Sequence, residues 1–192
     1  MPPTVVLITG ASRGIGRGLL EHYLSLTNHF VIAGLRDTKH ENSTALQDIP
    51  CGPGSKLIVV KIDNASPSDA KDATITLQKE YEIHHIDLVI ANAGICEHLV
   101  PIKNADVTEL NHLLTVNTWS LLHLYQAALP MLLKSSQPKL VYITSVMGSI
   151  SGATNNTGLT GPYGLSKAAG NFLIQKIRSE NSHLTAMAVD PG

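Results

Sequence analysis

The chain has 192 residues, of which 43% are hydrophobic and 15% are charged, a composition that predicts one folded domain and excludes disorder of the whole chain. The net charge is −1, no run of lysines or arginines occurs and only 4% of residues are aromatic, so we expect no nucleic-acid partner and no binding to an anionic membrane. No apolar run approaches the roughly 20 residues of a membrane span and no signal peptide is evident, so we expect a cytoplasmic protein.

Six short apolar segments alternate with helical patterns along the chain. We predict strands at residues 5–9, 30–35, 57–62, 86–91, 140–144 and 185–189. Most of them are continuous runs of Val, Ile, Leu and Ala, which is typical of strands buried on both faces of a parallel sheet. Such an alternation of strands and helices predicts the α/β class, as one three-layer, doubly wound parallel sheet of the Rossmann type over residues 1–192.

The predicted helices lie between these strands. The first presents one apolar face, made of Ile15, Leu19, Leu20, Tyr23 and Leu24. Another begins at Ser66-Pro67-Ser68-Asp69, with serine as the cap and aspartate three residues later, and runs to about residue 81. A long helix is predicted over residues 107–133, with Pro130 kinking or shortening its end, and a last one over residues 163–178. The turn-rich segments 38–55 and 148–162 are predicted to be loops.

The first strand leads directly into Gly10-Ala11-Ser12-Arg13-Gly14-Ile15-Gly16, a GxxxGxG sequence that opens a helix. Glycine permits a tight turn and lets a pyrophosphate approach the backbone, while the free N–H groups at the helix start hold its negative charge. A glycine-rich turn without a ligand is the alternative, but the position inside a βαβ unit favours a dinucleotide site. The predicted cofactor contacts in this loop are Gly10, Ser12, Arg13, Gly14, Ile15 and Gly16.

Arg36 stands twenty residues after Gly16, at the end of the second predicted strand. An acidic residue there would bind the ribose 2′-hydroxyl of NAD, whereas an arginine suits the 2′-phosphate of NADP. Arg13 adds a second guanidinium for a doubly charged phosphate. Asp37 would favour NAD if its side chain faced the ribose, and Arg36 taken alone also fits a solvated surface charge. The expected cofactor is NADP (NADPH), with NAD as the alternative.

Tyr163 and Lys167 are four residues apart in a predicted helix and so share one face. The ordinary tyrosine pKa of about 10 suits proton exchange poorly at neutral pH. A lysine cation about 6 Å away would stabilise phenolate by roughly 3 kcal/mol at an effective dielectric constant near 20, which would bring the pKa to about 8. Tyr163 could then exchange a proton with a substrate oxygen. By itself, however, the pair also fits an ordinary surface pair.

Several motifs follow one another in a fixed order. They are the loop from Thr9 to Gly16, Asn92-Ala93-Gly94 after a strand, Asn117 in the long helix, Ser145 after a strand, Tyr163-x-x-x-Lys167, and Asp190-Pro191-Gly192. This order resembles the short-chain dehydrogenase/reductase family over essentially the whole chain. The segment from Ser145 to Ala169 is similar to carbonyl reductases of the sniffer and C-factor kind and to fungal norsolorinic acid ketoreductases.

The resemblance implies a catalytic group. Tyr163 would be the acid/base, Lys167 would lower its pKa and bind the nicotinamide ribose, Ser145 would bind the substrate oxygen, and the Asn117 backbone would hold a water of the proton relay. The further cofactor contacts that it implies are Asp63 at the adenine, Asn92, Ala93 and Gly94 beside the cofactor, and Pro191 and Gly192. Taken alone, Ser145 also fits a strand-end cap, Asn117 a helix-surface amide and Asp63 a helix-entry turn.

The activity implied is NADPH-dependent reduction of a ketone or aldehyde to an alcohol. NAD-dependent alcohol oxidation and a non-catalytic NADP-binding redox sensor or scaffold are the alternatives. The implied partners are a small carbonyl or alcohol substrate and a second copy of the chain, in a homodimer or homotetramer built on helices 107–133 and 163–178. Nine histidines show no HExxH and no paired Cys/His spacing, so no metal site is predicted.

The sequence departs from the family pattern in two places. Ser145 and Tyr163 are 18 positions apart, a longer gap than usual, with residues 151–161 as an extra loop. Family members also continue beyond the Pro191-Gly192 motif into a substrate-binding segment. We therefore expect that the C-terminal part of the fold is missing and that the chain is cut before the segment that selects the substrate.

Overall fold

A six-stranded parallel sheet forms the centre of the computed structural model, which describes residues 2–97, 100–153 and 160–192. The strands are β1 (Thr4–Thr9), β2 (His29–Leu35), β3 (Lys56–Lys61), β4 (Leu88–Ala91), β5 (Lys139–Ile143) and β6 (Thr185–Val189). Each predicted strand is confirmed to within two residues. The spatial order is β3-β2-β1-β4-β5-β6, with every neighbouring pair parallel. The chain changes direction between β1 and β4, and this is where ligands bind in open sheets of this type.

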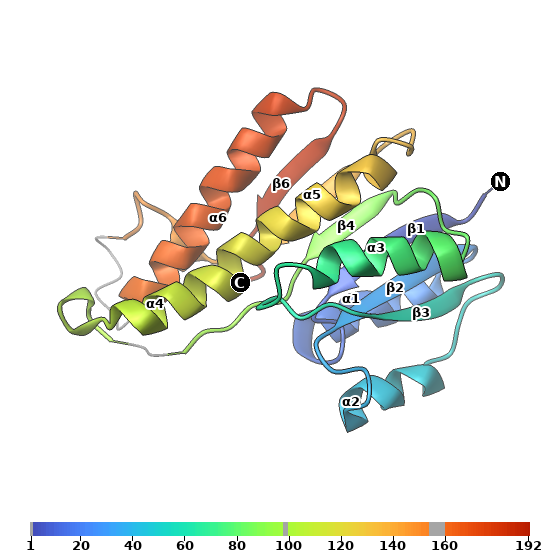
Figure 1. Ribbon diagram of the computed structural model, residues 1–192, viewed down its shortest axis with the longest axis horizontal. Helices are drawn as coiled ribbons and strands as arrows, with labels where there is room; N and C mark the ends of the chain where they lie inside the picture. Colours follow the sequence, from blue (N-terminus) through green and yellow to red (C-terminus); the bar gives the residue numbers. More distant parts are fainter. Residues whose placement is uncertain (1, 98–99, 154–159) are drawn as a thin grey trace.

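Helices cover both faces of the sheet, which confirms the three-layer, doubly wound fold. One face carries α3 (Asp69–Glu80), α4 (Val107–Leu114), α5 (Ser120–Leu132) and α6 (Gly161–Glu180), seen in front of the strands in Figure 1. The other face carries α1 (Gly14–Ser25), with α2 (Glu41–Thr44) beside it. A hydrophobic core lies on each face of the sheet, and β1 contributes side chains to both. Val5 and Leu7 pack toward α3 and α5, whereas Val6 and Ile8 pack toward α1.

Two local expectations are wrong, and the start of one helix is displaced. Ile15 is 49% exposed, whereas Gly16 is the buried residue in the first turn of α1. Helix α3 begins at Asp69, three residues after Ser66, but the Ser66 hydroxyl makes the contacts expected of a cap, because it accepts hydrogen bonds from the backbone N–H groups of Ser68 and Asp69. The predicted loop at 38–55 contains α2 and a 3-10 turn, η1 (Ala45–Asp48), and His40 caps the start of α2.

The predicted long helix is divided by a π-helical segment, η3 (Thr115–Trp119), between α4 and α5. Such wider turns are rare and often lie at functional sites. Pro130 lies inside α5, which ends two residues later at Leu132. None of the helices in the described residues is long and apolar enough to cross a membrane.

Candidate active site

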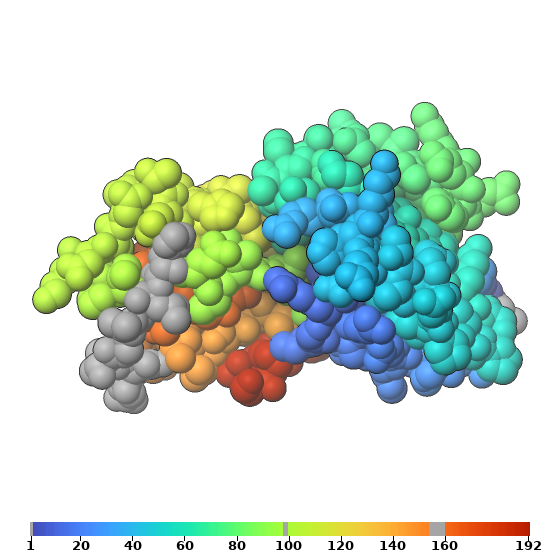
Figure 2. All heavy atoms as spheres, turned by 90° about the horizontal axis from the view of Figure 1, so that it is seen from below, coloured from blue at the N-terminus to red at the C-terminus, as the bar shows by residue number. Residues whose placement is uncertain are grey.

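The predicted site residues gather at one end of the sheet. Residues 10–16 follow β1, Arg36 follows β2, Asp63 comes after β3, residues 92–94 follow β4, Ser145 comes after β5, and residues 191–192 come after β6. Because all six strands are parallel, these ends share one edge. Asn117 on η3 and the pair Tyr163 and Lys167 on α6 reach the same edge, beside β4 and β5. Figure 2 shows the molecule from below, where the blue N-terminal segment, the green segment after β4 and the red C-terminal residues surround a hollow.

The glycine loop rests against the turn after β4. Gly10 has a left-handed φ of +66°, and a Cβ atom built on it would lie 2.9 Å from the Cα of Ala93. A Cβ atom on Gly16 would lie 2.4 Å from the carbonyl oxygen of Gly10. The Asn92 amide donates to the carbonyl oxygens of Thr9, at 2.9 Å, and of Gly10, at 3.4 Å. The positions of Gly10 and Gly16 therefore admit no side chain without movement of the loop.

The start of α1 is suited to an anion. Its N-cap residue Arg13 makes no side-chain capping bond, and the first turn of the helix contains no acidic residue. The backbone N–H groups there have no intrahelical acceptor, and the helix dipole adds positive potential at the same place. A pyrophosphate that approaches Gly14 and Gly16 would meet these N–H groups directly.

The side chains that would distinguish NADP from NAD lie at the ends of β1 and β2. Arg13 and Arg36 are both exposed, and neither forms an ion pair with a carboxylate among the residues that the structure describes. The Asp37 carboxylate instead accepts a hydrogen bond of 2.8 Å from the backbone N–H of Lys39. The Asp37 carboxylate thus stabilises a local turn with Lys39.

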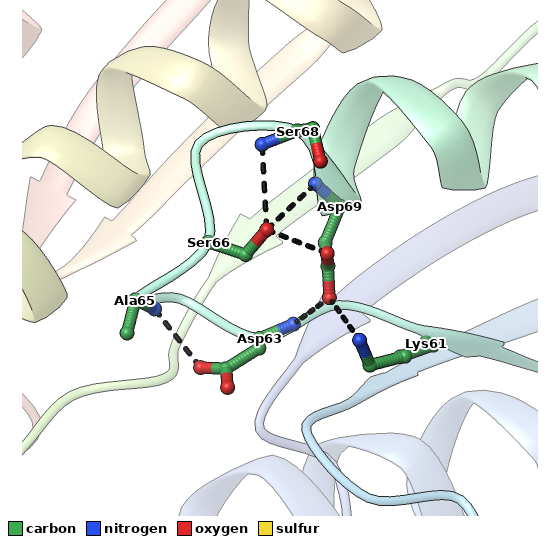
Figure 3. A network of polar contacts seen from close by, with 6 residues as sticks. All are labelled: Lys61, Asp63, Ala65, Ser66, Ser68 and Asp69. Carbon is green, nitrogen blue, oxygen red and sulfur yellow. Dashed lines mark hydrogen bonds and ion pairs between the residues drawn. The ribbon is translucent and has the colours of Figure 1, made fainter.

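The loop that follows β3 is held by an acidic side chain that the sequence interpretation treated only as a helix-start residue. Asp69 accepts hydrogen bonds from the backbone N–H of Asp63 at 3.0 Å and from the Ser66 hydroxyl at 2.6 Å, and it pairs with Lys61 at 3.1 Å (Figure 3). Its side chain is only 12% exposed. Burial pushes the pKa of Asp69 upward, but these three partners outweigh burial and hold the pKa below the ordinary value.

The Asp63 carboxylate points away from Asp69 and accepts a hydrogen bond of 2.9 Å from the backbone N–H of Ala65 (Figure 3). Asp63 therefore stabilises the turn that leads into α3, which was the alternative to a contact with the adenine. Its carboxylate also stands at the carboxyl edge of the sheet, next to the end of β2, where the adenosine half of a dinucleotide lies in this type of fold.

Lys167 is a buried cation that lies close to Tyr163. The lysine is 4% exposed, its Nζ donates to the carbonyl oxygen of Ile143 at 2.8 Å, and Nζ lies 5.8 Å from the centre of the Tyr163 ring. Tyr163 and Lys167 therefore lie on one face of α6, as their spacing of four residues predicted. Burial lowers the pKa of Lys167 to about 8, while the nearby Cys96 thiol acts in the opposite direction.

The expected lowering of the Tyr163 pKa is wrong for the groups that this chain itself provides. Burial raises the pKa of Tyr163 above its ordinary value of 10, the charges of Cys96 and Asp190 raise it further, and only a hydrogen bond with Ser145 lowers it. The attraction of Lys167 for a phenolate is offset by the cost of removing that phenolate from water, which the Tyr-x-x-x-Lys spacing does not reveal. At neutral pH the Tyr163 phenol is therefore protonated.

Asn117 is not a helix-surface amide, because it is only 1% exposed. Its Oδ1 accepts from the backbone N–H of Ile95 at 2.8 Å, and its Nδ2 donates to the Ile95 carbonyl at 2.9 Å and to the Ser166 hydroxyl at 3.0 Å. The side chain thus ties the segment after β4 to α6. Its backbone carbonyl accepts a hydrogen bond of 3.1 Å from the Tyr142 hydroxyl.

Ser145 has two roles in the structure. Its hydroxyl accepts a hydrogen bond of 3.2 Å from the backbone N–H of Met147, as the cap of the short turn η4 (Val146–Gly148), and its interaction with the Tyr163 phenol lowers the pKa of that phenol. Nearby Gly94 leaves the space in front of Lys167 open, because a Cβ atom there would lie 3.4 Å from Nζ.

Asn64 is a further residue of this region that the sequence pattern did not identify. Its amide donates to the carbonyl oxygens of Ala93 and Val116 and to the Ser120 hydroxyl, and in the sequence only its place beside Asp63 pointed to it. Of the extra loop predicted at 151–161, residues 154–159 lie outside the described residues.

In the described part of the chain, no group of three or more His, Cys, Asp or Glu side chains is placed to hold a metal ion.

Comparison with known proteins places this arrangement among related sequences and folds. Residues 4–192 match the family model described as short chain dehydrogenase. The chain is 39% identical to a norsolorinic acid ketoreductase of Emericella nidulans, over 98% of this chain and 72% of that protein. It is 38% identical to a norsolorinic acid ketoreductase of Dothistroma septosporum, over 98% of this chain and 71% of that protein. Its fold is similar to the crystal structure of NADPH-bound carbonyl reductase from chicken fatty liver, with a TM-score of 0.87 and 31% identity over 100% of this chain and 80% of that one.

Proposed function

We propose, from the premise that this chain belongs to the short-chain dehydrogenase family, that it is an oxidoreductase that uses NADPH to reduce a ketone or aldehyde to an alcohol. The family binds nicotinamide cofactors and acts on small molecules. The observation that carries the proposal is the approach of Lys167 Nζ to 5.8 Å from the Tyr163 ring, with the Ser145 hydroxyl near enough to the same phenol to lower its pKa. The names of the ketoreductase and carbonyl reductase relatives support a carbonyl substrate.

The residues present fit the cofactor. The close approach at Gly10 and Gly16 and the uncapped start of α1 would hold the pyrophosphate, Asp63 would face the adenine, and Lys167 would bind the nicotinamide ribose. Asn92, Ala93 and Gly94 would line the wall between the glycine loop and Lys167. When bound, NADPH supplies the hydride that reduces the carbonyl carbon.

The preference for NADP over NAD rests on the charged side chains after β1 and β2. The guanidiniums of Arg13 and Arg36 are exposed and form no ion pair with a carboxylate among the described residues, so they suit a 2′-phosphate, which arginine binds through two parallel hydrogen bonds. Asp37, the residue that would favour NAD, has its carboxylate bonded to the Lys39 backbone. A free carboxylate directed at the ribose would instead have repelled the phosphate.

Proton transfer follows from the environment of Tyr163. Because burial raises its pKa, the phenol carries its proton at neutral pH, and it would donate this proton to the oxygen of the carbonyl substrate. Ser145 would stabilise the negative charge that develops on the substrate oxygen. Lys167, with a pKa of about 8, is mostly charged at pH 7 and would stabilise the phenolate that remains after transfer.

The test compares wild-type protein with Tyr163→Phe, using NADPH and a panel of ketones and aldehydes that begins with norsolorinic acid. We expect wild-type turnover, seen as loss of NADPH absorbance, and a fall of at least about 1,000-fold in Tyr163→Phe, with NADPH affinity unchanged. Faster reaction with NAD and the matching alcohols would support the oxidation alternative. NADPH binding without turnover on any substrate would support a redox sensor or scaffold.

We also propose a homodimer or homotetramer, as is typical of the family. Support comes from apolar side chains left exposed on η3 and α6, with Trp119 at 45% and Phe172 at 67% exposure. Light scattering at micromolar concentration distinguishes these states from a monomer.

A further inference from the structure

Tyr142 contacts two members of the proposed catalytic group and has no role in the family motif. It lies on β5, three residues before Ser145, and is 1% exposed. Its hydroxyl donates to the Asn117 carbonyl at 3.1 Å, and the centre of its ring lies 4.9 Å from Lys167 Nζ. One buried side chain thus joins the π-helical segment to α6.

The fold makes room for this ring at a cost to α6. A Cβ atom built on Gly170 would lie 2.5 Å from the Tyr142 hydroxyl oxygen and 2.6 Å from two of its ring carbons. Glycine inside a helix is less stable than alanine, and Gly170 is an interior residue of α6. Because residue 170 has no side chain, the Tyr142 ring can occupy the space next to α6 where Lys167 Nζ lies over it.

Lys167 has few groups that stabilise its charge. The groups that face it are the Tyr163 phenol on α6, the Cys96 thiol after β4, the Ile143 carbonyl and the Tyr142 ring on β5. No carboxylate pairs with it in the described part of the chain. An aromatic face within about 6 Å of an ammonium attracts it, and more strongly where water is excluded.

The Asn117 carbonyl is the second group that Tyr142 holds. A carbonyl oxygen has two lone pairs, so the Tyr142 hydroxyl occupies one and leaves the other for a further donor. The hydrogen bond also fixes the direction of this carbonyl within a wide helical turn, where the regular α-helical pattern is interrupted.

We infer that Tyr142 is a positioning residue of the active site: its ring stabilises the Lys167 ammonium and its hydroxyl orients the Asn117 carbonyl for proton transfer. The second part rests on the proposed function, whereas the first does not require turnover. The two parts are separable, because phenylalanine at 142 keeps the ring and removes the hydroxyl, whereas leucine removes both.

The experiment uses Tyr142→Phe and Tyr142→Leu, with Tyr125→Phe as the matched control. Tyr125 also has a hydroxyl in one side-chain hydrogen bond, accepted from Asn181 at 3.0 Å, but it lies away from Lys167 on α5. The first readout is the NMR titration of the Lys167 side chain in protein labelled with [13C]lysine, its signal assigned by its loss in Lys167→Arg. The second is kcat and KM for NADPH in carbonyl reduction.

We expect Tyr142→Leu to lower the pKa of Lys167 below its wild-type value by about half a pH unit, the decrease that corresponds to loss of one cation–π contact. Tyr142→Phe should leave this pKa unchanged and lower kcat about fivefold, with KM for NADPH unaltered, whereas Tyr125→Phe changes neither. An unchanged or raised Lys167 pKa in Tyr142→Leu would overturn the role of the ring. A kcat for Tyr142→Phe equal to that of Tyr125→Phe would overturn the role of the hydroxyl.

Should Tyr142→Leu fail to fold, Tyr142→Met offers a longer apolar side chain without an aromatic face, and the same pKa decrease is expected. If wild-type protein reduces no carbonyl compound, the proposed function fails, but the Lys167 titration still decides whether the ring stabilises the ammonium.

Discussion

Gly16→Ala is the substitution that tests the glycine loop most sharply. The new Cβ atom would lie 2.4 Å from the Gly10 carbonyl oxygen and 2.5 Å from the Asn92 amide nitrogen, whereas ordinary contacts begin near 3.4 Å. One side must therefore move by about 1 Å, and Asn92 cannot retreat freely because it is bonded to Thr9 at 2.9 Å. We expect a loss of about 1 to 3 kcal/mol in the free energy of unfolding. NADPH should bind about 10 to 100 times more weakly, because the displaced loop forms the pyrophosphate cradle.

The matched control is Gly18→Ala, two residues further along α1. A Cβ atom on Gly18 meets no atom within 4 Å, so alanine there should leave NADPH affinity unchanged and stabilise the helix by up to about 1 kcal/mol. Urea unfolding measures the stability of both variants, and NADPH fluorescence measures their affinity. Wild-type NADPH affinity in Gly16→Ala, or an equal loss in both variants, would refute the assignment of the cradle.

Three further substitutions test other parts of the structure. Asp69→Asn should lower the free energy of unfolding, measured in urea, by about 1 to 3 kcal/mol at pH 7. Because the pKa of Asp69 in the folded protein lies below 3.8, the difference between wild type and variant should be present above pH 4 and should disappear as the pH falls through that folded pKa. Gly170→Ala should lower the free energy of unfolding in urea by about 1 to 2 kcal/mol, and this loss should be smaller when Tyr142→Leu is present in the same chain. An increase in stability on Gly170→Ala would show that the Tyr142 ring does not need the space beside residue 170. Arg36→Ala should weaken NADPH binding about tenfold in a fluorescence titration and leave NADH binding unchanged, whereas equal effects on both would exclude a 2′-phosphate contact.

The sheet and the position of the site could be predicted because both follow from local sequence. Continuous apolar runs such as that of β1 are buried on both faces, and so they identified the parallel strands. Once the strands are parallel, residues that follow them must meet at one edge, which is why Asp63, Ser145 and the glycine loop come together. The spacing of four residues on a helix likewise predicted that Tyr163 and Lys167 share one face.

The features that escaped prediction depend on contacts between distant segments. The π-helical segment around Asn117 is stabilised by partners on β5 and α6, none of which is near it in sequence. Tyr142 was counted only as part of an apolar strand, because its contacts with Lys167 and Asn117 exist only in the folded chain. The pKa of Tyr163 was expected in the wrong direction, since burial of the phenol cannot be read from a Tyr-x-x-x-Lys spacing.

Titration of the wild-type protein with NADPH and with NADH, followed by nicotinamide fluorescence, tests the central claim most directly. An NADP-dependent enzyme with Arg13 and Arg36 at the 2′-phosphate should bind NADPH tightly and NADH at least about tenfold more weakly. Tighter binding of NADH would contradict the roles of both arginines and the NADPH-dependent direction of the reaction. Binding of neither would contradict the assignment of the glycine loop as the cofactor site.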